Sequence, residues 1–142
     1  MNDNKYIKFL FKEIDKALKK EEVPVAALIV CNDTGKIIAK KHNKREVSHE
    51  TINHAEILCI SKANKRLKRK YLDNCSLYVT LEPCDMCKSI IKESRINSVY
   101  YLLPRNAEKK QYYKTNFLLW DNVLDKQVEY QQILTNFFKK RR

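Results

Sequence analysis

The segment "TLEPCDMCKSI" (residues 80–90) begins like a β-strand and then places two cysteines one helical turn apart, directly behind a proline. On a helix, Cys84 and Cys87 project from the same face, because residues three apart are neighbours there. Pro83 fits the first turn of such a helix, where its missing N–H costs no hydrogen bond. Amide dipoles at a helix N-terminus favour thiolates, which bind soft and borderline metals. The segment therefore predicts a strand followed by a helix that carries two metal-ligating sulfurs at its start.

Strands and helices alternate around this segment. The apolar stretches 23–31 and 36–43 flank the turn "NDTG" and predict a hairpin. Further strands are expected at 76–81 and 98–103, and helices at 4–20, 52–70, 83–94 and 126–140. Because the later strands are joined through helices, they are expected to pair in parallel, whereas the hairpin is antiparallel. The order predicts a mixed α/β/α sandwich.

The pattern weakens beyond Pro104. Residues 108–120 read as either helix or loop. The closing helix is expected to bury four apolar side chains in part, namely Val128, Ile133, Leu134 and Phe137. With 142 residues and no internal repeat or linker, residues 1–142 are expected to form a single domain.

Composition limits the partners and the compartment. The chain has 29 lysines and arginines against 17 acids, a formal charge of +12, which favours a polyanionic partner. The longest apolar run, Val23–Cys31, is too short to cross a bilayer, and the N-terminal residues lack the apolar stretch of a secretory signal. We therefore expect a cytoplasmic protein with no membrane partner.

Among the five cysteines only Cys84 and Cys87 are close in sequence, and a reducing compartment disfavours structural disulfides. The other three are interpreted as small buried hydrophobic residues without a role: Cys31, Cys59 and Cys75. A zinc site needs a third ligand, and His54 stands at the start of its own predicted helix, where it can meet the cysteines. His42 and His49 lie in polar surroundings and are expected at the surface.

Glu56 follows His54 by two residues, so on a helix the two side chains do not share a face and are not expected to chelate one ion. One histidine and two cysteines leave the fourth tetrahedral position for water, whose pKa zinc lowers from about 15.7 to about 7. Glu56 is then placed to shuttle the protons of that water.

Two other roles for the cysteine pair remain open at this point, since C-x-x-C is also typical of structural zinc sites and of thiol redox pairs. A closed structural site needs a fourth ligand. Cys59 lies well around the helix from His54, and the chain has no second C-x-x-C. The combination of "HAE" with "PCxxC", each opening a helix, therefore favours a catalytic site.

The motifs "HAE" (54–56) and "PCDMC" (83–87) resemble those of the zinc-dependent cytidine deaminase-like superfamily. The likeness is most detailed to the bacterial tRNA adenosine deaminases and is strongest from about residue 4 to residue 103. It rests on segments that follow in the same order: "EVPVAALIV", "HN" at 42–43, "NHAEI", "LYVTLEPCDMC", "SRI" and the terminal "FFKKRR".

This resemblance implies a three-layer α/β/α sandwich with a mixed five-stranded sheet. It implies one zinc ion per subunit held by His54, Cys84 and Cys87, with Glu56 as proton shuttle and Asn43 as a contact to the substrate nucleotide. The implied reaction is hydrolytic deamination of adenosine to inosine at the wobble position of a tRNA anticodon stem-loop. The implied assembly is a homodimer with active sites near the subunit interface.

The chain departs from the family after the strand that ends near residue 103. The family has an aspartate and several glycines there, whereas this chain reads "PRNAEKKQYYK", and Asn106 or a neighbour is expected in the aspartate's place. Two basic stretches are prominent, 62–71 and 137–142, of which the C-terminal one is expected to contact tRNA. Two alternatives stay open: a deaminase of a free base or nucleoside (cytosine, guanine or cytidine), and a noncatalytic zinc-stabilised RNA-binding module.

Overall fold

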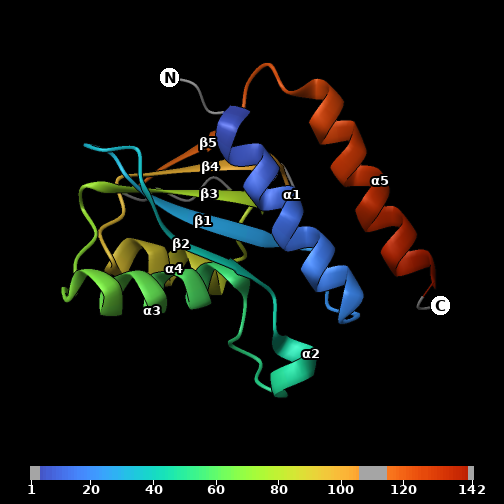
Figure 1. The fold of residues 1–142 in the computed structure, drawn as a ribbon, viewed down its shortest axis with the longest axis horizontal. Coiled ribbons are helices and arrows are strands. Elements are labelled where there is room, and N and C mark those ends of the chain that lie inside the picture. The colour runs from blue at the N-terminus through green and yellow to red at the C-terminus, as the bar shows by residue number, and fades with distance from the viewer. Residues whose placement is uncertain (1–3, 106–114, 141–142) are drawn as a thin grey trace.

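The computed structural model describes residues 4–105 and 115–140, so the expectation for Asn106 lies outside the described residues. Within these ranges five strands form one sheet in the order β2-β1-β3-β4-β5 (Figure 1). The strands are β1 (Ala26–Cys31), β2 (Ile37–His42), β3 (Cys75–Leu81), β4 (Ser98–Leu103) and β5 (Asn116–Leu119). β1 pairs antiparallel with β2 and β3, while β4 pairs in parallel with β3 and β5. The predicted mixed sheet and antiparallel hairpin are confirmed.

Helices cover both faces of the sheet (Figure 1). One face carries α1 (Asn4–Lys19) and α5 (Leu124–Lys140), and the other carries α3 (Ala55–Leu67) and α4 (Asp85–Glu93). The short α2 (Arg45–Ser48) lies in the connection between β2 and α3, which the sequence pattern left as a polar stretch. The three-layer α/β/α sandwich is therefore confirmed.

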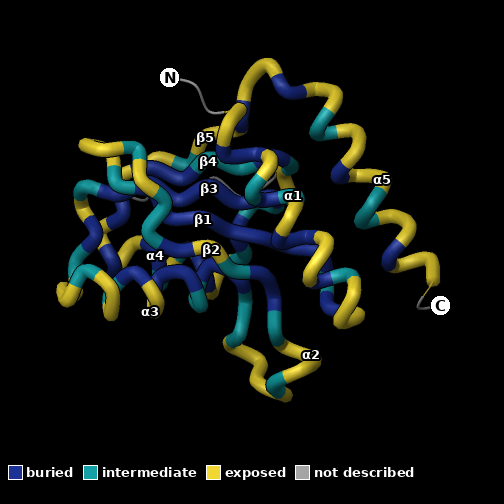
Figure 2. Tube along the Cα trace, viewed as in Figure 1, coloured by how far each residue is buried: buried dark blue, intermediate teal, exposed yellow. Residues whose placement is uncertain are grey.

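The central strand β3 separates two apolar cores, because its successive side chains point to opposite faces. Leu77 and Val79 pack in the core under α3 and α4, and Tyr78 packs in the core under α1 and α5. The ring of Tyr78 lies 4.8 Å from that of Tyr6 and 5.2 Å from that of Trp120, between ring centroids. Figure 2 shows β1 and β3 buried along their length. The carboxyl end of β3 therefore extends from a part of the sheet that helices cover on both faces.

Three sequence expectations need correction at element boundaries. Residues 116–119 form β5, where the pattern gave helix or loop; this short edge strand exists because β4 offers it a parallel partner. Pro83 lies one residue before the N-cap of α4, outside the first turn. Val128 is 61% exposed, because α5 buries the stripe that contains Tyr130 and Phe137, whereas Ile133 and Leu134 are partly buried as expected.

His42 was expected at the surface, and this prediction is wrong. Its side chain is 5% exposed, and its Nδ1 donates to Oε1 of Glu13 on α1 over 3.1 Å. Lys16 completes the group, with its Nζ 2.8 Å from Oε2 of Glu13. The hydrogen bond with His42 lowers the pKa of Glu13 to about 2 from an ordinary value of 4.5. His49, in contrast, is exposed as predicted.

Glu13→Gln is expected to lower the free energy of unfolding at pH 7 by about 1–3 kcal/mol, because it removes a carboxylate that is bonded in the folded state. A lowered folded-state pKa contributes stability that is present above about pH 4.5 and is lost as the pH falls towards 2. Urea unfolding at pH 7 and pH 3 should therefore show a smaller acid loss for the variant than for the unmodified protein. Asp15→Asn, an exposed change on the same helix, is the control; equal acid losses in all three proteins would contradict the prediction.

Candidate metal centre

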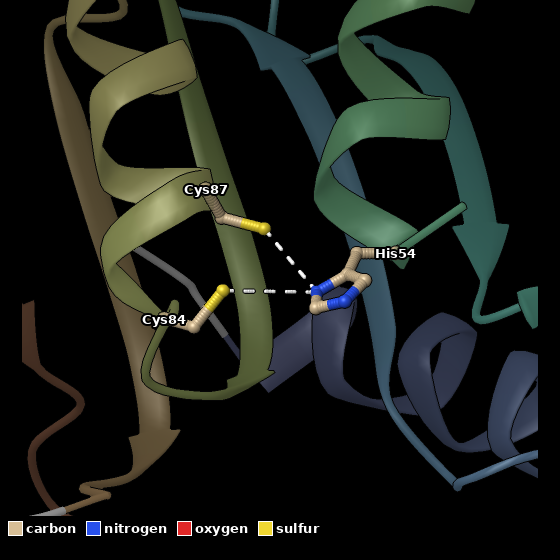
Figure 3. Close-up of side chains that lie close together, drawn as sticks. All are labelled: His54, Cys84 and Cys87. Carbon is tan, nitrogen blue, oxygen red and sulfur yellow. Dashed lines mark hydrogen bonds between the residues drawn. The ribbon is translucent and has the colours of Figure 1, made fainter. Parts of the chain in front are cut away.

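His54 and Cys84 occupy equivalent positions at the starts of two helices. His54 is the N-cap of α3 and Cys84 the N-cap of α4, both with extended backbone, and neither side chain makes a capping hydrogen bond. Cys87 follows in the first turn of α4, on the same side as Cys84. Figure 3 shows the imidazole ring and both sulfurs pointing towards one another. Two helix starts therefore bring the three predicted metal ligands to one point.

The distances between these three donors match a tetrahedral metal site. Nδ1 of His54 lies 3.4 Å from Sγ of Cys87 and 3.8 Å from Sγ of Cys84. A zinc ion with ordinary Zn–N and Zn–S bonds at tetrahedral angles would hold such atoms about 3.6 Å apart. Within residues 4–105 and 115–140, no other histidine, cysteine or carboxylate joins these three side chains. The donor set therefore fits zinc with one coordination position left for another ligand.

The two thiols differ in acidity. Hydrogen bonds with Cys87 and His54 lower the pKa of Cys84 to about 3. The hydrogen bond to Cys84, together with burial, raises the pKa of Cys87. The site thus already stabilises one thiolate, and a bound divalent cation deprotonates a coordinating thiol outright.

Glu56 lies beside the donor group on the first turn of α3. It is 2% exposed, and its Oε1 has no hydrogen-bond partner among the described residues. Burial raises the pKa of this carboxyl, and its charge in turn raises that of Cys87. A buried carboxylate oxygen without a partner is costly, and such groups are concentrated at functional sites. Glu56 is therefore a buried acid close to the three donors but not one of them.

Asn43 makes a contact that the sequence did not reveal. Its Oδ1 accepts a hydrogen bond from the backbone N–H of Ala55 over 2.8 Å, and its side chain is buried. This bond satisfies an N–H at the start of α3 and fixes the helix that carries His54 and Glu56. No sequence signal identified this contact, because Asn43 and Ala55 meet only after the chain has turned through α2.

Glu22 is a second residue that sequence reasoning missed. Its carboxylate is buried and accepts hydrogen bonds from the backbone N–H groups of Glu46 at 3.0 Å and Val47 at 2.7 Å. These bonds hold the start of α2 against the connection between α1 and β1. The segment that leads from β2 to His54 is therefore anchored at both ends, by Glu22 and by Asn43.

The remaining cysteines are not part of the donor group. Cys59 and Cys75 are fully buried, and Sγ of Cys59 donates to the carbonyl oxygen of Ala27 over 3.2 Å. Cys31 is only partly buried, at the end of β1. The expectation of buried, apolar cysteines is thus confirmed for Cys59 and Cys75 and holds in part for Cys31.

The mixed sheet between two helical layers is that of the cytidine deaminase-like fold. A solved structure from work on A-to-I editing by tRNA:A34 deaminases at the wobble position of transfer RNA superposes with a TM-score of 0.76 and 26% identity, over 84% of this chain and all (100%) of that chain. The chain belongs to the MafB19-like deaminase family, whose sequence model matches residues 1–142.

Two other relatives are informative. The tRNA-specific adenosine deaminase of Aquifex aeolicus is 45% identical over 101 residues, which make up 71% of this chain and 66% of that enzyme. The match thus spans somewhat less than two thirds of that relative's length. The guanine deaminase of Bacillus subtilis superposes with a TM-score of 0.67 and 25% identity, over 96% of this chain and 95% of that one.

No helix within the described residues is long and apolar enough to span a membrane.

Proposed function

We propose that this protein is a zinc-dependent hydrolytic deaminase that converts adenosine to inosine at the wobble position of a tRNA anticodon. The observation that carries the proposal is the convergence of His54, Cys84 and Cys87 beside the buried carboxylate of Glu56, whose Oε1 has no hydrogen-bond partner among the described residues. Membership of a deaminase family supports the reaction, and the relatives named for tRNA and adenosine support the substrate. We also propose that residues 1–142 form a single deaminase domain.

His54, Cys84 and Cys87 would hold one zinc ion per subunit, which supplies a water molecule acidic enough to act as nucleophile near neutral pH. Glu56 does the proton transfer in this proposal. Its Oε1 accepts a proton from the attacking water and returns it to the departing amino nitrogen of adenine. Burial raises the pKa of Glu56 and so makes its carboxylate a stronger base than a surface glutamate.

Conversion of an arginine anticodon stem-loop is the direct test of this function. The RNA is incubated with zinc-loaded protein beside free adenosine, cytidine, cytosine and guanine, and the deaminated products are identified by mass spectrometry. Inosine in the stem-loop alone is the expected result. Conversion of a free base or nucleoside without conversion of the RNA would overturn it.

The second candidate is a guanine deaminase, favoured by the near full-length likeness to the Bacillus subtilis enzyme. Xanthine from guanine in the same assay would identify it. A small purine has no need of the strongly basic surface of this chain, whose formal charge of +12 favours a polyanion. We therefore place tRNA first, and a noncatalytic RNA-binding module last, because a structural zinc site does not require Glu56.

Asn43 is proposed to contact the substrate nucleotide through its amide N–H₂ while its oxygen holds Ala55. Asn43→Ala is expected to lower the free energy of unfolding by about 1–2 kcal/mol, because the Ala55 N–H loses its buried acceptor. Asn43→Asp keeps an acceptor and should stay within about 0.5 kcal/mol, yet lose kcat/KM, because it lacks the amide donor. Urea unfolding and steady-state kinetics separate the two roles. Full activity of Asn43→Asp would exclude the proposed contact of Asn43 with the substrate.

The proposed tRNA surface includes the C-terminal turn of α5, where Lys139 and Lys140 are exposed beside Phe138. Replacing both lysines with alanine is expected to weaken tRNA binding and to reduce the slope of log K against log salt by about 1.4. Lys62→Ala with Lys65→Ala on α3 removes the same charge elsewhere and is the matched control. Equal slopes for the two double variants would exclude a specific role for the α5 terminus.

We further propose a homodimer in the cytoplasm, where tRNA is found. The family resemblance supports the dimer, and light scattering of the zinc-loaded protein at micromolar concentration tests it. A monomeric mass at full activity would exclude a required dimer.

A further inference from the structure

Cys31 and Cys75 face each other directly across the antiparallel pair β1–β3, at the end of the strands away from the metal centre. One step further in the same register, Asn32 donates its backbone N–H to the carbonyl oxygen of Asn74 over 2.8 Å. Hydrogen-bonded and non-hydrogen-bonded pairs alternate along an antiparallel ladder, so the cysteines form a non-hydrogen-bonded pair. Cα atoms of such pairs are about 4.5 Å apart, at the lower end of the range of about 4.4–6.8 Å that a disulfide bridges.

The two sulfurs also converge on one side chain. Nδ2 of Asn74 lies 3.9 Å from Sγ of Cys31, and Sγ of Cys75 donates to Oδ1 of the same amide over 3.5 Å. Both cysteines point to the face of the sheet that α3 and α4 cover, because they are direct cross-strand partners. The thiols are therefore placed side by side by backbone pairing and by a shared polar contact.

Cys31 and Cys75 differ in exposure and in acidity, and these differences give each thiol a separate step in an oxidation. Cys31 is partly exposed, and a hydrogen bond from the hydroxyl of Thr34 lowers its pKa. Cys75 is fully buried, and burial raises its pKa. A thiol that is accessible and has a lowered pKa is the one that attacks an oxidant, and a neighbouring protected thiol then resolves the product.

We propose that Cys31 and Cys75 form a reversible intrachain disulfide on exposure to a hydroperoxide. The Cys31 thiolate attacks one peroxide oxygen, the O–O bond breaks, and Cys31 becomes a sulfenic acid as an alcohol or water leaves. The Cys75 sulfur then attacks the Cys31 sulfur, the S–O bond breaks, and the sulfenic hydroxyl group leaves as water with the Cys75 proton. Two thiols lose two electrons and the hydroperoxide gains them. A dithiol reductant reverses the change by exchange.

The bond would close the segment from residue 31 to residue 75, which contains β2, α2 and α3 and therefore His54 and Glu56. Closing a loop of this length restricts the unfolded chain, and Tm is expected to rise on the order of 10 °C. The metal centre lies at the opposite end of β3, so oxidation acts on stability without rearranging the ligands.

The test uses the full zinc-loaded chain, treated with a small excess of hydrogen peroxide, alkylated, and digested with trypsin and chymotrypsin without reduction. Trypsin alone leaves Cys75 on one peptide with Cys84 and Cys87, and cleavage after Tyr78 separates them. The expected product is a Cys31 peptide linked to a Cys75 peptide, absent after dithiothreitol. The rise in Tm should appear in the unmodified protein and in Cys59→Ala, and vanish in Cys31→Ser.

Several outcomes would overturn the proposal. One is a Cys84–Cys87 bond while Cys31 and Cys75 remain open to alkylation. Others are oxidation of Cys31 beyond the sulfenic acid without a linked peptide, and a disulfide between two chains on a non-reducing gel. The peptide linkage is read from the unmodified chain, so the test does not depend on how well any variant folds.

Discussion

Glu56→Gln should lower kcat for deamination by about 100- to 10,000-fold while zinc content stays at one ion per chain. Glutamine has nearly the same shape, but its amide cannot accept and return a proton at neutral pH. The ligands His54, Cys84 and Cys87 are untouched by the change. Single-turnover kinetics on the stem-loop, with metal analysis of the same sample, measure both quantities. Near-normal turnover in this variant would refute the assignment of Glu56.

The same substitution should leave the protein at least as stable as before. Glu56 buries a carboxylate whose Oε1 has no hydrogen-bond partner in the part of the chain that the structure describes, and burial raises the pKa of this carboxyl. The ionised form is therefore disfavoured in the folded state. A neutral amide removes that cost, in keeping with the usual trade-off between activity and stability at functional sites. Glu50→Gln, an exposed change in the loop before His54, is the matched control and should alter neither activity nor Tm.

Cys87→Ala should remove most of the zinc and lower the free energy of unfolding by about 4 kcal/mol or more. A metal that binds only the folded state stabilises it in proportion to the logarithm of its affinity, and a 1000-fold loss of affinity is worth about 4 kcal/mol. Losing one of three protein ligands is expected to cost at least that factor, because folding and metal binding are linked. Metal analysis and urea unfolding, each at a fixed free zinc concentration, measure the two effects.

Cys59→Ala provides the control for this second variant. Cys59 is as fully buried as Cys87 and lies in the same apolar core, but its thiol donates to the Ala27 carbonyl and takes no part in the donor group. It should lose on the order of 1 kcal/mol from packing and keep its zinc. Full zinc occupancy in Cys87→Ala, or equal losses in both variants, would contradict the assigned ligand.

The sequence predicted that His54, Cys84 and Cys87 would meet, because their positions follow from local rules. Cys84 and Cys87 share a face through helical spacing, and His54 stands at a recognisable helix start. The pairing of His42 with Glu13 joins residues far apart in the chain, and no local pattern reports it. The edge strand β5 was missed for a similar reason, since its four residues form a strand only beside β4. Local spacing therefore predicted which side chains meet, and the features that it missed depend on tertiary partners.

The starts of α3 and α4, where the donors lie, pack into the buried core on one face of the sheet. The α2 connection, β5 and α5 are at its margins, and each exposes apolar or basic side chains. Mutations at these margins can alter which molecule is admitted while the reactive atoms keep their places. During evolution, proteins with this fold can therefore acquire new substrates through changes at the margins of the sheet. The reaction itself can stay the same, because the donors are not affected.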